Sequence, residues 1–211
     1  MRVALTFDTE HPGRPCPSGV EEHLLDILGR AGVRATFFLQ GRWVRSTPET
    51  ARRIAHAGHL VGNHSHYHAP LDGLTAKAFR HDVRRAENTI RAVVGVDPRP
   101  WFRCPFGSGT DKPKILAALG ELGYRHVGWD VDALDWDETR DSNLLVETVA
   151  EETLAREDDT IVLMHGWPAA TAQALGGLLG RLAAAGVEFV GVDALESVEG
   201  SVVVTSRLLA K

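Results

Sequence analysis

Short runs that favour β-structure alternate with longer amphipathic segments along almost the whole chain. This alternation is typical of βα units, in which each helix returns the chain so that successive strands run parallel. The runs that predict strands lie at residues 2–7, 35–39, 59–62, 101–102, 126–129, 160–164 and 188–192. The pattern therefore predicts an α/β fold with about seven parallel strands, arranged as a sheet or a barrel.

The segments between these runs have the periodicity of amphipathic helices. The predicted helices lie near residues 19–31, 48–57, 75–94, 112–122, 142–156 and 169–185. Five of them are followed by a glycine at the usual C-terminal stop, namely Gly32, Gly58, Gly95, Gly123 and Gly186. We expect one domain over residues 1–211, in which residues 197–211 form a short closing strand or an arm.

Composition excludes several classes of protein. Of the 211 residues 44% are hydrophobic, which is enough for a substantial core, and the net charge is −5 with both signs interspersed. This balance predicts no nucleic acid partner, although it leaves room for a local basic patch. No apolar stretch approaches the roughly 20 residues that span a bilayer, and two cysteines are too few for a disulfide framework.

The N-terminus bears on location. The first predicted strand begins directly after Met1, which leaves no room for a secretory signal. We therefore expect a cytoplasmic protein, or a secreted or cell-surface one if a leader has been removed. The sequence does not predict the oligomeric state.

Polar residues follow the predicted strands, where parallel barrels carry their chemistry. They are Asp8, Glu10, His64, His68, Arg103, the acidic residues after Trp129, and His165. Residues that share this edge of a fold lie close together even when they are far apart in sequence. The pattern predicts one site at the carboxyl ends of the strands.

Two histidines and a carboxylate suggest a metal ion. His64 and His68 are four residues apart, the spacing that puts two imidazoles on one helical turn. Asp8 and Glu10 share one side of the first strand, whereas Thr9 points elsewhere. Taken alone, each pair also fits a solvated loop or turn. Together they supply the three ligands that a hydrolytic metal site needs, with an open position for water.

Three further motifs follow strands, and they make a family recognisable. They read RCPFG at 103–107, DALDW at 132–136 and LMHGW at 163–167. With Thr6–Asp8 and His64–His68 they resemble, in order, the five motifs of the polysaccharide deacetylases of carbohydrate esterase family 4, the NodB-like domains. The resemblance covers nearly the whole chain. It implies a distorted (β/α) barrel, an acetylated sugar as substrate, and a divalent metal, usually zinc, with cobalt, nickel or manganese as alternatives.

The same resemblance implies roles for the residues around the metal. His64 and His68 are the expected ligands, and Asp8 is the expected general base on metal-activated water. The family usually has a second aspartate next, as a ligand, where this chain has Thr9. A hydroxyl is a poor substitute, so we expect Glu10 to complete the set. The competing arrangement is an Asp8 that binds the metal directly.

The third motif is expected to support the base and the oxyanion. In the family its arginine, here Arg103, holds the base aspartate, and the backbone N–H at Phe106 helps to bind the oxyanion. Because this N–H belongs to the backbone, it is present although phenylalanine replaces the usual tyrosine. Cys104, which stands where proline is common, is not expected to be a nucleophile, because no base lies beside it in sequence.

The fourth and fifth motifs are expected to supply the acid and the pocket. Asp135 corresponds to the aspartate that orients the catalytic histidine, and His165 to the general acid itself. Trp136 and Leu163 are expected to line the pocket for the acetyl methyl. Gly166 replaces the usual aspartate, which we expect to alter the groove more than the chemistry.

Two other functions compete with sugar deacetylation. One is hydrolysis of another non-peptide C–N bond, in a formamide, a cyclic ureide or an imide, as in relatives with atypical first motifs. The other is a noncatalytic carbohydrate-binding relative, which Thr9 favours. Retention of Asp8, both histidines, Arg103, Asp135 and His165 argues against a decayed site. Two classes of acetylated sugar are compatible with the sequence: a cytosolic sugar or sugar conjugate, and a chitin-type or peptidoglycan polymer.

Overall fold

A computed structural model of the chain describes residues 1–10, 16–156 and 158–195, and the predicted tail at 197–211 lies outside them. The described strands form one sheet in which all pairs are parallel. They are β1 (Arg2–Thr9), β2 (Thr36–Leu39), β3 (Leu60–Asn63), β4 (Trp101–Phe102), β5 (Arg125–His126), β6 (Val131–Asp132), β7 (Thr160–His165) and β8 (Glu188–Phe189). Seven follow the order β5-β4-β3-β2-β1-β7-β6, and β8 pairs with β1.

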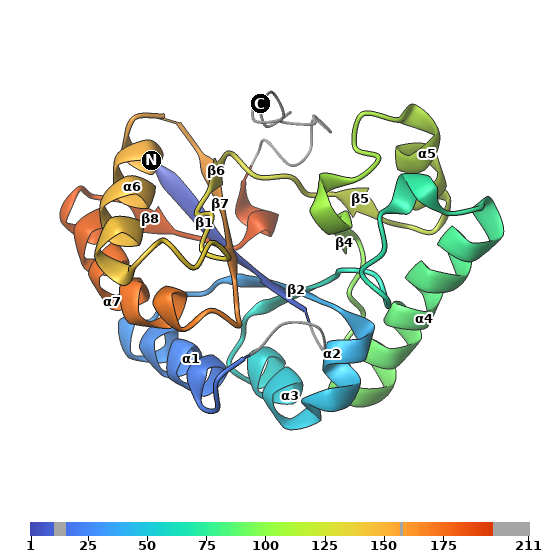
Figure 1. The fold of residues 1–211 in the computed structure, drawn as a ribbon, viewed down its shortest axis with the longest axis horizontal. Helices are drawn as coiled ribbons and strands as arrows, with labels where there is room; N and C mark the ends of the chain where they lie inside the picture. Colours follow the sequence, from blue (N-terminus) through green and yellow to red (C-terminus); the bar gives the residue numbers. More distant parts are fainter. Residues whose placement is uncertain (11–15, 157, 196–211) are drawn as a thin grey trace.

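Helices surround the curled sheet (Figure 1). They are α1 (Val20–Ala31), α2 (Gly41–Ser46), α3 (Pro48–His56), α4 (Ala76–Val94), α5 (Pro113–Glu121), α6 (Ser142–Leu154) and α7 (Ala169–Ala184). Three short 3-10 helices are η1 (Leu71–Gly73), η2 (Pro105–Gly107) and η3 (Val192–Ala194). Among the described strands no pairing joins β5 to β6, so the barrel is open. The predicted distorted (β/α) barrel of about seven parallel strands is confirmed.

The predicted elements differ from the observed ones most clearly in four places. The strand expected at 126–129 ends at His126, and the chain then crosses to β6, which was not predicted. The six-residue helix α2 was also not predicted, because it is too short to show a helical period. The strand expected at 188–192 is reduced to β8, and Val192 begins η3. The predicted glycine stops are confirmed by left-handed backbone, for example φ 83° at Gly95.

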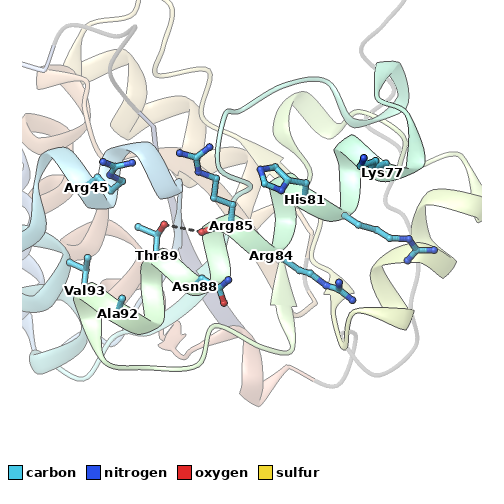
Figure 2. A pocket seen from close by; sticks show the side chains of 10 residues that line it. Arg45, Lys77, His81, Arg84, Arg85, Asn88, Thr89, Ala92 and Val93 are labelled. Carbon is cyan, nitrogen blue, oxygen red and sulfur yellow. Dashed lines mark hydrogen bonds between the residues drawn. The ribbon is translucent and has the colours of Figure 1, made fainter.

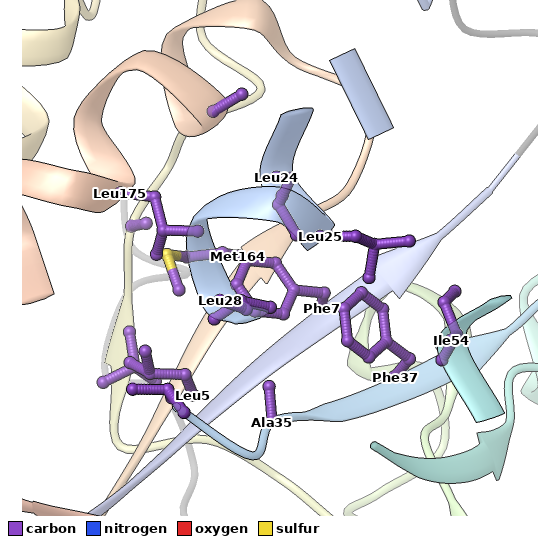
Figure 3. Packing of buried hydrophobic residues seen from close by; sticks show 14 of the residues in the cluster. Leu5, Phe7, Leu24, Leu25, Leu28, Ala35, Phe37, Ile54, Met164 and Leu175 are labelled. Carbon is purple, nitrogen blue, oxygen red and sulfur yellow. The ribbon is translucent and has the colours of Figure 1, made fainter. Parts of the chain in front are cut away.

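Strand β1 lies between the largest apolar cluster and the candidate site at the carboxyl ends of the strands. Its odd positions Val3, Leu5 and Phe7 are buried under α1 and α7 in the largest apolar cluster (Figure 3). Phe7 stacks on Phe37 of β2 with ring centroids 5.0 Å apart. Burying each such side chain stabilises the fold by roughly 1.5–3 kcal/mol.

The even positions of β1 face the inside of the barrel. Ala4 packs there in a second apolar cluster with Phe38 and Trp101. Thr6 and Asp8 follow on the same side, since side chains alternate along a strand. Packing of the odd positions therefore fixes the direction of Asp8. Of the helices the structure describes, none is long and apolar enough to span a membrane.

Candidate metal centre and active site

The strands that carry the predicted motifs end at the same level. Asp8 lies opposite His165 of β7 and Phe38 of β2 in the sheet register. Asn63, the last residue of β3, pairs with Phe102 of β4. His64 and Arg103 directly follow these two residues, so the histidine and arginine motifs leave adjacent strands side by side.

Glu10, His64 and His68 form a cluster that fits a divalent metal ion. The Nε2 atoms of His64 and His68 are 3.0 Å apart, and Glu10 Oε2 is 2.5 Å from His68 Nε2. One ligand atom from each residue lies within 4.8 Å of the others. Two imidazoles and a carboxylate are a usual zinc ligand set that leaves a fourth position for water.

The protonation states of His64 and Glu10 also suit a metal. His64 Nδ1 is 2.9 Å from the Arg103 carbonyl oxygen, an acceptor, so Nδ1 carries the hydrogen and Nε2 has the free lone pair. Burial lowers the pKa of His64 to about 4. Burial opposes ionisation of Glu10, but the hydrogen bond from His68 and the charges of the nearby imidazoles outweigh it and lower its pKa to about 2. Neutral imidazole and ionised carboxylate are the states that bind a cation.

The histidines lie on a loop, so the expectation of a helical turn is wrong. Left-handed backbone at Ser65 (φ 62°) and His68 (φ 57°) turns both imidazoles the same way. The Ser65 N–H donates to Asn63 Oδ1, 2.8 Å away, and the His68 N–H donates to Ser65 Oγ at 3.0 Å. These side chains replace the hydrogen bonds of a helix and fix the spacing of the ligands.

The loop is also anchored to α4 by a buried carboxylate that the sequence analysis did not identify. Asp82 accepts hydrogen bonds from the backbone N–H groups of His66 at 3.3 Å and Tyr67 at 3.0 Å. The sequence contains a signal for this contact, because Asp82 lies in the apolar stripe of α4 between Phe79 and Val83. An acidic residue at such a position needs a partner.

Asp8 is held beside the metal cluster by Arg103. Arg103 Nη1 donates to Asp8 Oδ1 at 3.0 Å and to Thr6 Oγ1 at 2.7 Å. The guanidinium is fully buried, and it also donates to the carbonyl oxygens of Val127 and Gly128. Asp8 Oδ2 is 3.5 Å from His64 Nε2. One Asp8 oxygen is therefore engaged by the arginine while the other faces the cluster.

His165 and Asp135 form a pair on another side of the cluster. His165 Nδ1 donates to Asp135 Oδ1 at 2.7 Å, and Asp135 Oδ2 accepts from the His165 N–H and the Thr171 hydroxyl. Burial opposes the imidazolium, but the charge and hydrogen bond of Asp135 outweigh it and raise the pKa of His165 to about 9. His165 Nε2 lies 3.9 Å from Glu10 Oε1. A protonated nitrogen thus faces the cluster.

The three predicted pocket residues lie in different surroundings. Phe106 has left-handed backbone (φ 56°), and its ring packs on His68 with centroids 4.4 Å apart. No acceptor for its N–H lies in the described parts of the chain. Leu163 is buried on the same face of β7 as His165, and the exposed Trp136 directly follows Asp135. Phe106 therefore lies against the metal cluster through its contact with His68.

Thr9 and Cys104 have no part in the cluster. The Thr9 hydroxyl donates to the Phe38 carbonyl at 3.3 Å, and its methyl lies near Gly166, away from Glu10. Burial raises the pKa of Cys104 to about 12, so this thiol stays protonated. Neither residue can supply a metal ligand or an anionic nucleophile.

Residues 1–127 match the family model described as polysaccharide deacetylase. The chain belongs to the polysaccharide deacetylase family. It is 31% identical to the chitooligosaccharide deacetylase of Azorhizobium caulinodans over 166 residues, which are 79% of this chain and 74% of that protein. The predicted family is confirmed, and this relative is named as a deacetylase.

Solved structures of family 4 carbohydrate esterases have the same fold. The esterase from Streptomyces lividans, in complex with acetate, superposes with a TM-score of 0.75 at 31% identity, covering 89% of this chain and 91% of that one. A pseudoenzyme of the family from Bacillus anthracis superposes with a TM-score of 0.79 at 27% identity, covering 92% and 64%. The chain spans 43% of the length of one further curated relative and 70% of another.

Proposed function

We propose that this chain is a metal-dependent hydrolase that removes the acetyl group from an N-acetylated sugar. The observation that carries the proposal is the Glu10, His64 and His68 cluster, flanked by a carboxylate held by Arg103 and by a charged histidine held by Asp135. A base that activates the nucleophile and an acid that protonates the leaving group must lie on different sides of the substrate carbonyl, and Asp8 and His165 lie on different sides of the cluster. The deacetylases named among the relatives support the same reaction.

Zinc suits two imidazoles and one carboxylate best, and cobalt, nickel or manganese are alternatives. When bound, the ion polarises the amide carbonyl and lowers the pKa of a ligated water towards roughly 7. Asp8 would take the proton of that water through the oxygen that faces the cluster. Arg103 holds the other oxygen through a hydrogen bond.

The remaining residues would complete the turnover. The Phe106 N–H would donate to the oxyanion as the carbonyl becomes tetrahedral. His165 would protonate the departing amine, and Asp135 would hold the imidazole in position. Trp136 and Leu163 would enclose the acetyl methyl. The products are acetate and a free amino sugar.

Acetate release from N-acetylglucosamine oligomers tests the roles of base and acid. Asp8→Asn and His165→Ala should each lower the rate by about 100-fold to 10,000-fold while the fold is kept. Asp111→Asn and His56→Ala, at exposed positions, are matched controls that should keep the wild-type rate. Full turnover by either site variant would refute its assigned role.

A noncatalytic carbohydrate-binding function is the second candidate. It is favoured by Thr9, which departs from the family's first motif, and by the existence of a pseudoenzyme relative. Metal analysis combined with the acetate assay separates the two candidates. A protein that binds oligosaccharide but releases no acetate with zinc, cobalt, nickel or manganese would support the binding function. Assays with formamides, cyclic ureides and imides test the remaining hydrolase alternative.

A further inference from the structure

A basic groove lies between α2 and α4, outside the site described above. It is lined by Arg45 of α2 and by Lys77, His81, Arg84 and Arg85 of α4 (Figure 2). Its volume is about 890 Å³, and its lining contains no acidic residue. We call it the α4 groove. A concentration of positive charge is unexpected in a chain whose net charge is −5.

The charges of the α4 groove are largely uncompensated. Arg80, which also lines the groove, pairs with Glu121 at 2.7 Å. In the described part of the chain no carboxylate lies within ion-pair distance of Arg45, Lys77 or Arg84. Like charges gathered without partners repel one another, so they disfavour the folded state. The same field attracts and concentrates an anionic ligand.

The α4 groove is connected to the metal loop. The Arg85 guanidinium donates to the Tyr67 hydroxyl and lies over the Tyr67 ring, 5.2 Å from its centroid. Tyr67 is the neighbour of the metal-ligand candidate His68 and is 46% exposed. The first residue of α2, Gly41, donates its N–H to the Ser65 carbonyl at 2.9 Å. Both helices that line the groove therefore contact the loop that carries His64 and His68.

We propose that the α4 groove binds the anionic part of the glycan whose acetylated sugar lies at the metal centre. The ligand class is an amino-sugar polymer with carboxylate or phosphate substituents, and the inference rests on the proposed deacetylase function. Arginine forks pair with both anions through two parallel hydrogen bonds. The exposed Tyr67 ring offers a flat surface to the sugar between the groove and the metal.

The position and size of the groove favour a glycan over other polyanions. A volume of about 890 Å³ is near the upper end of the range for ligand pockets, so it fits a segment of polymer better than a single ion. Arg85 of the groove contacts Tyr67 of the metal loop, so the groove adjoins the loop that carries the proposed substrate site. A docking surface for nucleic acid or lipid headgroups would have no need of a contact with this loop.

Binding measurements with a charge-reversed variant test this proposal. The variant R45E/K77E/R84E reverses three groove charges without touching Tyr67, Arg85 or the metal cluster. The control R30E/K114E/R181E makes the same change in net charge at exposed positions of α1, α5 and α7. The ligands are fluorescent glycan strands of alternating N-acetylglucosamine and N-acetylmuramic acid, the same strands with attached phosphate polymer, and neutral chitin oligomers.

We expect the groove variant to bind the carboxylate or phosphate glycan at least about tenfold more weakly than wild type at low ionic strength. Added salt should reduce the difference, because exposed charges are screened. The control should bind like wild type, and all three proteins should bind neutral chitin oligomers equally. Comparison of the two anionic glycans identifies which anion is preferred. The variant R45Q/K77Q/R84Q should show a smaller loss and replaces the first variant if that one does not fold.

Two results would overturn the proposal. One is wild-type affinity of a folded groove variant for both anionic glycans. The other is tighter binding of duplex DNA or phosphatidylglycerol vesicles than of either glycan. Acetate release is a separate measurement that tests the proposed function. Groove-dependent binding can be measured even for a protein that deacetylates none of the three glycans, so the two proposals can fail independently.

Discussion

At the scale of residues, the site depends on which side chains of β1 and its extension face the barrel. Asp8 and Glu10 share the inner side, while Thr9 between them points towards the outer layer and donates to the Phe38 carbonyl. A carboxylate two positions after the proposed base therefore reaches the histidines. Although position 9 lacks the aspartate usual in the family, Glu10 gives the cluster a carboxylate.

Removal of this carboxylate should weaken metal binding. Glu10→Gln replaces the anionic oxygen by a neutral amide, and we expect zinc affinity to fall on the order of 100-fold. Thr9→Ala, one residue away but on the outer side, should leave the affinity unchanged. Zinc titration against a chromophoric chelator measures both. Equal affinities of the two variants would show that Glu10 is not a ligand.

The His165 and Asp135 pair should make the metal-free protein less stable as the pH rises. The pKa of His165 is raised to about 9 in the folded state, from an ordinary value near 6.5. Its contribution is therefore fully present below about pH 6.5 and is lost as the pH rises through about 9. The shift corresponds to on the order of 3 kcal/mol.

Urea unfolding at pH 6.5 and 9.5 in the presence of chelator measures this dependence. His165→Gln, which cannot form the charged pair, should lose most of the difference in unfolding free energy between the two pH values. His56→Gln at an exposed position should keep it. A wild-type stability that rises with pH over this interval would contradict the assignment.

At the scale of elements, the metal loop is held between α2 and α4. Asp82 of α4 accepts its N–H groups, and the first residue of α2, Gly41, packs directly on His66. A Cβ at Gly41 would lie 2.2 Å from His66 Nδ1 and 3.1 Å from the backbone of Ala86. The close approach of the two helices therefore depends on a glycine at this position.

Gly41→Ala should separate α2 from the loop. We expect a loss of about 1–3 kcal/mol in the free energy of unfolding, together with weaker zinc binding. Gly29→Ala in α1 is the matched control, because nothing lies within 4 Å of its added Cβ. That change should stabilise the protein by about 0.4–1 kcal/mol. Urea denaturation of both variants measures the effects, and equal stability would contradict the packing argument.

Long elements, whose hydrophobic pattern repeats several times, could be predicted from the sequence, and short elements could not. Helix α4 was predicted to within one residue, because 19 residues show an apolar stripe and Gly95 ends it. Two-residue β6 and six-residue α2 have too few positions for a period, and only neighbouring elements hold them in place.

The same limit applies to the candidate site. Residues at the end of a strand or directly after it, such as Asp8, His165 and His64, could be predicted because the strand end fixes their position. Asp82 lies in the middle of a helix, and its contact with the loop depends on tertiary packing. The helical turn expected for His64 and His68 was wrong, because the spacing of four residues is compatible with a loop that side chains hold in place.

At the scale of the whole molecule, the open barrel brings two kinds of surface together. The carboxyl ends of the strands carry the candidate metal ligands Glu10, His64 and His68, with the proposed base and acid beside them. The α4 groove adds positive charge beside the loop of that cluster, although the chain as a whole is negative. This arrangement suits an enzyme that cuts a small group from a large anionic substrate.

The most direct test of the account is a zinc titration of acetate release. Metal-free protein is mixed with increasing zinc, and acetate from N-acetylglucosamine oligomers is measured at each ratio. We predict no release without metal and a linear rise to a plateau at about one zinc per chain, since one cluster supplies all the ligands. Release that is independent of zinc and chelator, or no release with any divalent metal, would contradict the account.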